Sequence, residues 1–461
     1  MRPERQQRIA YGKTILLVSF LLLIGLPSHG EASSSRYHNY LLQAESELGF
    51  NGSVLVMKDD SILLAEGYGL ANRELSIPNT ADTKFLLCSV TKQFTATAIM
   101  QLAERGSLDL DDPITKYISR YAGSSADRIT IYNLLTQTSG IVDYLSLTDS
   151  NETFSRFMPT EQVVSMFMDA PLEFEPGSKW QYSNSNYYLL GKIIETVSGM
   201  TYGGFLEMNI FRPLEMNNSG LPVQYLNDLP KAATGYNADG AGELVAEPAV
   251  HSSWPFAAGG LYSTVNDMAK WERALRNETV LRNKSIVKMN TPFKWRYGCG
   301  WEIDTLYGYP VGSHGGMGGG YCSIIIRFID RPVCVVVLGN NEDAFKQVSK
   351  IAYDLVAITF DAQSEEFRGD ELVAIDPRVL EEYAGDYELA PGVAIAFRCR
   401  DGKMFTQGPG QPEVEIYPRS QTEFFLKVVE GSVQFVHDST GIVSRIIIRQ
   451  GGREISANKI R

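Results

Sequence analysis

The chain has 461 residues, a length typical of a protein with one large and one small domain. Hydrophobic residues make up 44% of the chain and charged residues 21%, a composition typical of a globular protein. Its formal net charge is −12, and the sequence has no basic stripe, so we expect no nucleic acid as a partner, because an acidic surface repels phosphate backbones. The five cysteines are far apart and the histidines do not cluster, so we expect no metal site. No phosphate-binding glycine loop is present, and we expect no cofactor.

The first 30 residues have the features of an export signal. A positively charged start extends to Lys13 and precedes an apolar run over residues 15–26. This run is short for a membrane span, which needs about 20 residues. We therefore expect residues 1–30 to be a signal peptide and the protein to be exported, either to the periplasm or as a secreted protein. The alternative is an uncleaved signal anchor.

The elements after this signal begin with a helix and a β-hairpin. Helical spacing covers residues 37–48, and two β-rich runs at 53–58 and 62–68 flank a pair of aspartates that is typical of a hairpin turn. A long helix is predicted over residues 89–105, where apolar side chains recur every four residues, and Gly106 is its expected end. Because this apolar stripe needs a surface to cover it, the helix should be central.

The middle of the chain is mostly helical, and strands return before the end of the large domain. Clear helical patterns cover residues 189–197 and most of 256–274. The late strands are expected at residues 297–304, 309–313, 321–329 and 333–338, and a helix follows at 344–360. Strands on both sides of a helical insertion predict an α+β domain over residues 31–360, in which one antiparallel sheet is flanked by helices.

A polar stretch over residues 361–376 predicts a linker to a second, smaller domain at 377–461. Short β-rich runs recur in this domain at turn-like spacing. They cover residues 383–389, 393–399, 414–417, 423–429, 433–436 and 444–449. This pattern predicts a small all-β domain that resembles a barrel.

Ser89 stands at the start of the predicted central helix, and Lys92 follows three residues later. Residues three apart on a helix are neighbours, with Cβ atoms roughly 5–6 Å apart, so the amine can activate the hydroxyl as a nucleophile. The same Ser-x-x-Lys pattern also starts at Ser285, where surrounding charges favour a solvated surface helix instead. Cys88 offers a thiol, but its apolar neighbours favour a buried structural cysteine.

A second stretch with reactive side chains is Tyr182-Ser183-Asn184, in a predicted loop before an apolar helix. Loops of this kind tend to display functional side chains. The reference pKa of a phenol is near 10, so Tyr182 needs a nearby cation such as Lys92 to lower its pKa if it is to act as a base. The alternative is an aromatic side chain that anchors the loop.

A third stretch, residues 312–321, is rich in glycine and contains His314. It runs directly into a predicted strand, and glycines at a strand edge allow a substrate backbone to approach and pair with it. The alternative is a flexible hairpin loop with a histidine that is satisfied by its surroundings.

The three motifs start at Ser89, Tyr182 and His314, in the order Ser-x-x-Lys, Tyr-x-Asn and His-x-Gly. This order resembles the serine hydrolase family that contains class C β-lactamases, D-alanyl-D-alanine carboxypeptidases, D-aminopeptidases and related esterases. Flanking stretches agree with the family at residues 134–140, 180–191 and 258–264. The resemblance covers residues 40–360 and implies a β-lactamase/transpeptidase-like fold. The segment from Tyr383 resembles a small β-domain often appended to such proteins.

The resemblance implies a hydrolase that cleaves an ester or an amide of a small molecule or peptide through an acyl-enzyme on Ser89. Lys92 and Tyr182 would share the work of general base and proton relay. The backbone N–H groups of Ser89 and Met317 would form the oxyanion hole. The implied substrate-binding residues are Asn184, His314, Gly316 and Met317.

Two positions depart from the family pattern. His314 stands where the β-lactamases and carboxypeptidases have lysine, so we expect an esterase or a D-amino-acid-directed peptidase more than a true β-lactamase. With a reference pKa near 6.5, His314 should titrate near neutrality and favour carboxylate-bearing substrates as the pH falls. Gln137 stands where a histidine is common. The alternative function is a penicillin-binding-like module that binds or senses a ligand and acylates slowly.

Overall fold

The computed structural model describes residues 29–118, 126–148, 154–240, 242–361, 375–390, 393–400, 402–408, 413–418, 420–426, 431–438, 440–450 and 453–460. Most of the predicted signal at 1–30 and of the predicted linker at 361–376 lies outside these residues. Within the described ranges, no helix combines the length and the apolar character that crossing a membrane requires.

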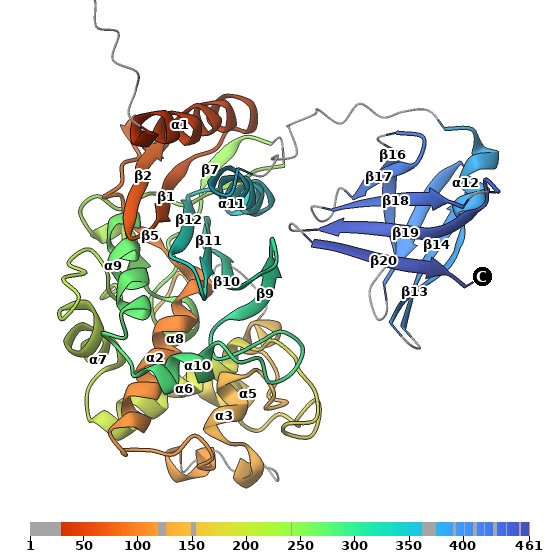
Figure 1. The fold of residues 1–461 in the computed structure, drawn as a ribbon. Helices are drawn as coiled ribbons and strands as arrows, with labels where there is room; N and C mark the ends of the chain where they lie inside the picture. Colours follow the sequence, from red (N-terminus) through yellow and green to blue (C-terminus); the bar gives the residue numbers. More distant parts are fainter. Residues whose placement is uncertain are drawn as a thin grey trace, which may run out of the picture.

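The large domain is built on one antiparallel sheet with the strand order β2-β1-β12-β11-β10-β9 (Figure 1). Strand β1 pairs with β12, from Gly52 opposite Gly339 to Lys58 opposite Val333, so the two ends of the domain meet in the middle of the sheet. The predicted antiparallel sheet is therefore confirmed. The strands are β1 (Gly52–Lys58), β2 (Ser61–Tyr68), β9 (Glu302–Leu306), β10 (Tyr309–Gly318), β11 (Tyr321–Phe328) and β12 (Val333–Gly339).

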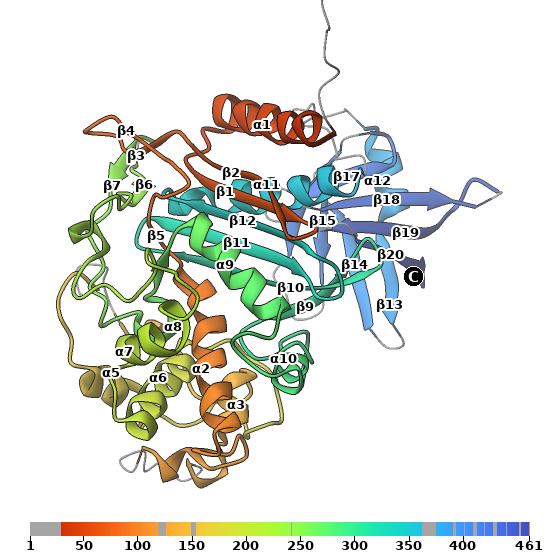
Figure 2. The same ribbon diagram turned by 60° about the vertical axis from the view of Figure 1, so that its left-hand side comes forward.

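Helices cover both faces of this sheet (Figure 2). In β1, Val54 and Val56 pack into one core with α1 (His29–Leu48) and α11 (Phe345–Thr359), whereas Leu55 and Met57 pack into a second core on the other face. Because successive side chains of a strand point to opposite faces, a strand buried on both faces is apolar throughout. The run Val54–Met57 is such a strand, and it places the sheet in the interior.

The helical half of the domain packs on the second face. The helix predicted over residues 89–105 is α2 (Lys92–Glu104), preceded by a 3-10 helix, and it is central as expected: every side chain from Lys92 to Leu102 is buried. Phe94 stacks on Trp271 with ring centroids 4.2 Å apart. The surrounding helices are α3 (Ile131–Leu135), α5 (Thr160–Phe167), α6 (Asn184–Ser198), α7 (Tyr202–Leu206), α8 (Phe256–Gly259), α9 (Val265–Arg276) and α10 (Asn283–Met289).

Two predicted strand boundaries were wrong. The strand expected at 297–304 is β9, which begins only at Glu302, after Gly300 with φ of 75°. Strand β10 continues to Gly318, so most of the glycine-rich stretch is strand, and Gly319 and Gly320 form the turn to β11. Glycine is usually depleted in strands, but here its missing side chain lets β10 pass close to another backbone segment.

The second domain is a closed eight-stranded barrel with its own core, in which Tyr383 stacks on Phe435 with centroids 4.2 Å apart. The sequence predicted the barrel-like class but missed α12 (Pro377–Tyr383), β15 and β20. Among the β20 residues whose burial the structure describes, Ala457 is buried and belongs to the core, whereas Ile455 is 39% exposed. The barrel strands are β13 (Gly385–Ala390), β14 (Val393–Arg400), β15 (Lys403–Gln407), β16 (Val414–Pro418), β17 (Glu423–Leu426), β18 (Ser432–His437), β19 (Val443–Gln450) and β20 (Arg453–Lys459).

A buried ion pair joins α9 to the sheet and generates a stability prediction. Arg327 donates to Glu272 at 2.7 Å, and both side chains are at most 3% exposed. Arg327→Met leaves a buried carboxylate whose remaining ion-pair partner among the described residues is Arg276, and it should lower the free energy of unfolding by about 3 kcal/mol. Urea denaturation followed by tryptophan fluorescence measures this domain, because all five tryptophans lie within residues 180–301.

The matched control is Arg128→Met, which removes an ion pair with Glu175 whose two side chains are 53% and 65% exposed. Exposed pairs contribute little, so this variant should lose less than about 1 kcal/mol. Equal losses in the two variants would show that the buried pair does not hold α9 to the sheet.

Candidate active site

Ser89 lies in a short 3-10 helix, η1 (Cys88–Thr91), that leads directly into α2. It is half-buried between two buried neighbours and lines a cavity. Cys88 has φ of 48°, a left-handed conformation that costs on the order of 1–3 kcal/mol for a residue with a side chain and occurs often at functional sites. The expected burial of Cys88 is confirmed, and this burial raises the pKa of its thiol well above the usual value. Ser89 is therefore the better nucleophile.

The amine of Lys92 is buried next to Ser89. Its Nζ lies 3.1 Å from Ser89 Oγ, 2.8 Å from Asn184 Oδ1 and 2.8 Å from the carbonyl oxygen of Ala258. Burial lowers the pKa of Lys92 to about 7, although the carboxylate of Asp143 acts in the opposite direction. Near neutral pH a large fraction of Lys92 is thus uncharged and able to accept a proton.

Tyr182 lies on the other side of the same amine, with its ring centroid 4.7 Å from Lys92 Nζ. Its hydroxyl interacts with Ser89, but burial dominates and raises the pKa of the phenol. The condition under which Tyr182 could act as a base, a pKa lowered by a nearby cation such as Lys92, is therefore not met, because the cost of burying a phenolate exceeds the help from its neighbours. Tyr182 is a neutral phenol here, which can relay a proton, and Lys92 has the pKa of a base.

Gln137 fixes the segment that carries Tyr182. Its buried Oε1 accepts hydrogen bonds from the backbone N–H of Ser183 at 3.1 Å and from Asn186 Nδ2 at 2.6 Å. Its backbone oxygen accepts from the N–H of Gln181 at 3.0 Å. The departure from the family's histidine thus places an amide that holds Ser183 and Asn186 after Tyr182, whereas the residue before Tyr182 is held by the backbone of Gln137. The sequence analysis noted that Gln137 departs from the family pattern but assigned no role to this residue.

Sequence reasoning missed Asp143, which contacts the second motif. Its Oδ2 accepts a hydrogen bond from Asn184 Nδ2 at 2.9 Å. The only signal in the sequence is its place three residues after the family-like stretch at 134–140.

The second Ser-x-x-Lys pattern, which starts at Ser285, does not form a similar pair. Ser285 on α10 donates to Glu104 at 2.6 Å instead of contacting a lysine.

The structure places His314 inside the protein, 2% exposed, and not among the described residues that line the cavity. Its Nδ1 lies 2.6 Å from the carbonyl oxygen of Gly315, which can only accept, so Nδ1 carries the proton and Nε2 accepts from the hydroxyl of Tyr297 at 3.0 Å. Burial and the positive charge of Lys92 lower the pKa of His314 to about 3. The expectation that His314 titrates near neutrality is therefore wrong.

Gly316 brings strand β10 against the nucleophile. A Cβ atom at this position would lie 2.7 Å from the backbone nitrogen of Ser89 and 2.6 Å from the carbonyl oxygen of Leu87, so only glycine fits. The next residue, Met317, lines the cavity beside Ser89 and has a side chain that is 57% exposed. The backbone of residues 316–317 is thus next to the Ser89 amide, as an oxyanion hole made by Ser89 and Met317 requires.

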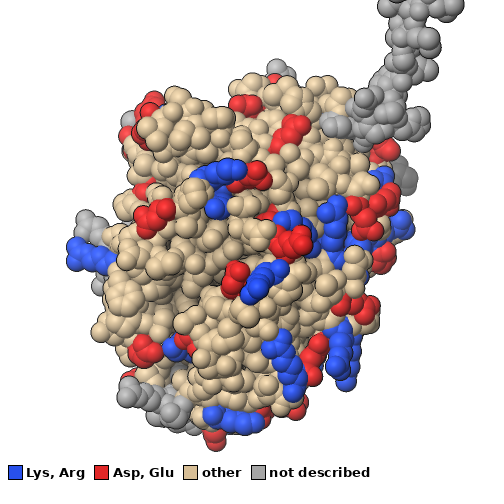
Figure 3. Space-filling model, turned by 90° about the vertical axis from the view of Figure 1, so that its left-hand side faces the viewer, with Lys and Arg blue, Asp and Glu red and all other residues tan. Residues whose placement is uncertain are grey.

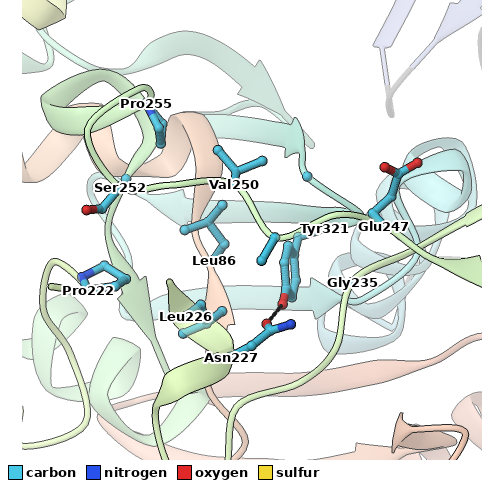
Figure 4. A pocket seen from close by; sticks show the side chains of 13 residues that line it. Leu86, Pro222, Leu226, Asn227, Gly235, Glu247, Val250, Ser252, Pro255 and Tyr321 are labelled. Atoms are coloured by element: carbon cyan, nitrogen blue, oxygen red, sulfur yellow. Dashed lines mark hydrogen bonds between the residues drawn. The ribbon is translucent and has the colours of Figure 1, made fainter. Parts of the chain in front are cut away.

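The cavity has a volume of about 310 Å³ and contains Ser89, Asn184 and Met317 in its lining. Glu247 and Glu342 are the charged residues among the described lining residues, so the cavity is acidic. A narrower pocket shares part of this lining, with Glu247 at one end beyond Tyr321 and Ser252 at the other (Figure 4). On the face shown in Figure 3, basic and acidic side chains are interspersed, without a continuous basic tract.

Comparison with known proteins identifies the family. The family described as "Beta-lactamase" matches residues 45–357, which is more than half of the chain. This chain belongs to the beta-lactamase family. Residues 370–459 match a domain of unknown function, DUF3471. The expected family and the expected fold class are thereby confirmed.

Several members of this family are similar over long stretches. Penicillin-binding protein 4* of Bacillus subtilis is 29% identical over 88% of this chain and 94% of its own length. D-aminopeptidase of Gluconobacter oxydans is 27% identical over 65% of this chain and 58% of its own length. The structure of an octameric penicillin-binding protein homologue from Pyrococcus abyssi covers 92% of this chain and 99% of its own, with 26% identity and a TM-score of 0.65.

The environment of His314 generates a direct spectroscopic prediction. Since its pKa is lowered to about 3, its imidazole carbon and nitrogen chemical shifts should stay constant between pH 5 and pH 8 in an NMR titration. The constant signal should correspond to the tautomer protonated on Nδ1 and should disappear in His314→Gln, which assigns it. A midpoint above pH 5 for the signal that this variant loses would contradict the buried, neutral histidine.

Proposed function

We propose that this chain is an exported serine hydrolase that cleaves an ester or amide bond through an acyl-enzyme on Ser89. One observation carries the proposal: the fully buried Lys92 amine lies 3.1 Å from Ser89 Oγ, and its other hydrogen-bond partners among the described residues are two acceptor oxygens. Membership of the beta-lactamase family supports the reaction class. The N-terminal segment, with its charged start and apolar run, supports export to the periplasm or out of the cell.

The reaction follows from these positions. Uncharged Lys92 takes the proton of Ser89 as Oγ attacks the substrate carbonyl carbon. The backbone N–H groups of Ser89 and Met317 stabilise the negative charge that forms on the carbonyl oxygen. The neutral phenol of Tyr182 gives its proton to the leaving group and takes in exchange the proton that Lys92 gained from Ser89, so that both side chains end this step uncharged. Water then attacks the acyl carbon and gives one proton to this pair, and Ser89 Oγ leaves with a proton, which releases the acid and restores the enzyme.

The charge of the cavity favours a substrate with an ammonium group over one with a carboxylate. Glu342 accepts from the backbone N–H of Gly320 at 2.9 Å, and Asn237 Nδ2 donates to Glu247 at 2.7 Å. Burial raises the pKa of Glu342, and the charge of Glu247 adds to this effect, as expected for two acids in a cavity whose described lining residues include no cation. A substrate ammonium group would supply that cation.

This acidic lining and the neutral His314 favour a D-amino-acid-directed peptidase or an esterase over a β-lactamase. The relative named D-aminopeptidase, 27% identical, supports the amino-acid-directed reading. A second candidate is a penicillin-binding-like module that is acylated and does not turn over. It is favoured by the relative named penicillin-binding protein 4*, which matches 88% of this chain. Burst kinetics without subsequent turnover on esters, D-amino-acid amides and β-lactams would select this candidate.

The nucleophile is tested by covalent labelling. Wild-type protein should react with a fluorescent fluorophosphonate, and Ser89→Ala should lose more than about 99% of the label, since the attacking oxygen is removed. Ser285→Ala is the matched control, because it removes the serine of the second Ser-x-x-Lys pattern and should label like wild type. Equal labelling of Ser89→Ala and wild type in a gel assay would overturn the assignment.

The substrate preference is tested with D-phenylalanine p-nitroanilide and its analogue without the amino group, 3-phenylpropionyl p-nitroanilide. At pH 7 the amino group is mostly protonated. Glu342→Gln should lower kcat/KM about 10-fold for the first substrate and leave the second within about 2-fold, because one charged contact is worth about 1.4 kcal/mol.

Glu243→Gln makes the same charge change at an exposed residue that does not line the cavity, and it should leave both values unchanged. If Glu342→Gln lowers kcat/KM by the same factor for both substrates, or lowers it for neither, the preference for an ammonium group is contradicted. The assignment of Ser89 as the nucleophile would not be affected by this result.

A further inference from the structure

The side-chain amide of Asn184 connects two charged residues. Its Oδ1 lies 2.8 Å from Lys92 Nζ, and its Nδ2 donates to Asp143 Oδ2 at 2.9 Å. Lys92 Nζ lies 3.1 Å from Ser89 Oγ. A continuous series of hydrogen bonds therefore runs from the Asp143 carboxylate to the Ser89 hydroxyl.

The number of N–H groups on Lys92 determines what this series can do. A protonated lysine has three donors and no lone pair, whereas an uncharged one has two donors and one lone pair. Asn184 Oδ1 and the carbonyl oxygen of Ala258 can only accept, so in the uncharged state they hold both N–H groups. The lone pair then points at the third neighbour, Ser89, whose proton it must accept.

This arrangement depends on which end of the Asn184 amide faces Lys92. With the amide turned over, Nδ2 would face Lys92 and donate to the lone pair, and Ser89 would lose its base. The carboxylate of Asp143 can only accept, so it pairs with Nδ2 and keeps Oδ1 towards Lys92.

We infer that Asp143 is a positioning residue: through the Asn184 amide it directs the lone pair of Lys92 at the Ser89 hydroxyl. The inference rests on the proposed function, since it concerns how the nucleophile is activated. It is compatible with the substrate contact expected of Asn184, because Nδ2 has a second N–H and Asn184 lines the cavity.

The two oxygens of Asp143 have different partners. Oδ1 accepts from the backbone N–H of Leu145 at 3.1 Å and so caps the 3-10 helix η4 (Tyr144–Leu147), and Oδ2 accepts from Asn184. Asparagine at position 143 would have one acceptor oxygen for these two donors. Either the helix loses its cap or the amide of Asn184 turns over, and in both cases the negative charge near Lys92 is lost.

Several titratable groups surround the Lys92 amine, and Asp143 is one of them. Those that face the amine are Cys88 of η1, Asp143 ahead of η4, Tyr182 and Tyr187 of the α6 segment, and His314 of β10. Asp143 supplies the carboxylate in this described set, and its charge raises the pKa of Lys92 against the effect of burial. Removal of this charge should therefore lower the pKa of Lys92.

The test is the second-order rate constant for labelling by the fluorophosphonate, measured from pH 5 to pH 9. In Asp143→Asn the rate at pH 8 should fall about 100-fold, the factor expected for a misdirected general base. The midpoint of the rise with pH should also move to lower pH, because Lys92 loses the charge that raises its pKa. A merely structural role would lower the melting temperature and leave this midpoint in place.

The double variant Asp143→Asn with Asn184→Asp exchanges the two side chains. It restores an acceptor facing Lys92 and moves the negative charge next to it. It should therefore label faster than Asp143→Asn, with a midpoint at higher pH than in wild type. If the single variant unfolds, the labelling rate and midpoint of the double variant serve as the test instead. Unfolding of both variants at 25 °C would also contradict the inference.

Thr201→Ala is the control for a lost helix cap, because Thr201 caps α7 by accepting from the N–H of Gly204. It should lower the melting temperature without moving the midpoint. If Asp143→Asn keeps the wild-type rate and midpoint while labelling still requires Ser89, the inference fails and the proposed function stands. If Ser89→Ala labels like wild type, the proposed function itself fails.

Discussion

The structure of the site depends on the burial of one amine. Lys92 is at the start of the central helix, its side chain is fully buried, and it contacts a hydroxyl, an amide oxygen and a backbone carbonyl. In water this amine would be protonated near neutral pH, but burial lowers its pKa to about 7. The fold thereby makes this lysine, which would be a cation in water, a base next to a serine.

The rest of the domain supplies the surroundings that this burial needs. The sheet joins strands from both ends of the domain, and Gly316 lets β10 lie against the backbone of Ser89. Helix α8 contributes the carbonyl oxygen of Ala258, and the loop before α6 is held in place by Gln137. Segments far apart in the sequence thus each provide one contact around Lys92 and Ser89. This explains why a large domain is needed to position a small number of reactive atoms.

Local patterns predicted much of this arrangement. The neighbours Ser89 and Lys92 follow from helical spacing, and the hairpin, the antiparallel sheet and the barrel-like class follow from alternating apolar residues. The contacts of Gln137 and Asp143 could not be predicted, since each reaches a partner more than 40 positions away. The pKa of His314 was misjudged because it depends on burial, which is a property of the packed fold and not of the residue. Strand β20 was missed because its side chains are mostly polar.

The relation between Lys92 and Ser89 also explains why the acidic cavity and the neutral histidine can coexist with an activated serine. The base needs no cation among the residues that line the substrate space, so the substrate can bring its own. The most direct measurement of this account is the pH dependence of Ser89 acylation in the wild-type protein. The rate should rise with a midpoint near pH 7, where Lys92 loses its proton, and then level off. A flat profile from pH 5 to pH 9, or a midpoint close to the reference pKa of lysine near 10.4, would contradict it.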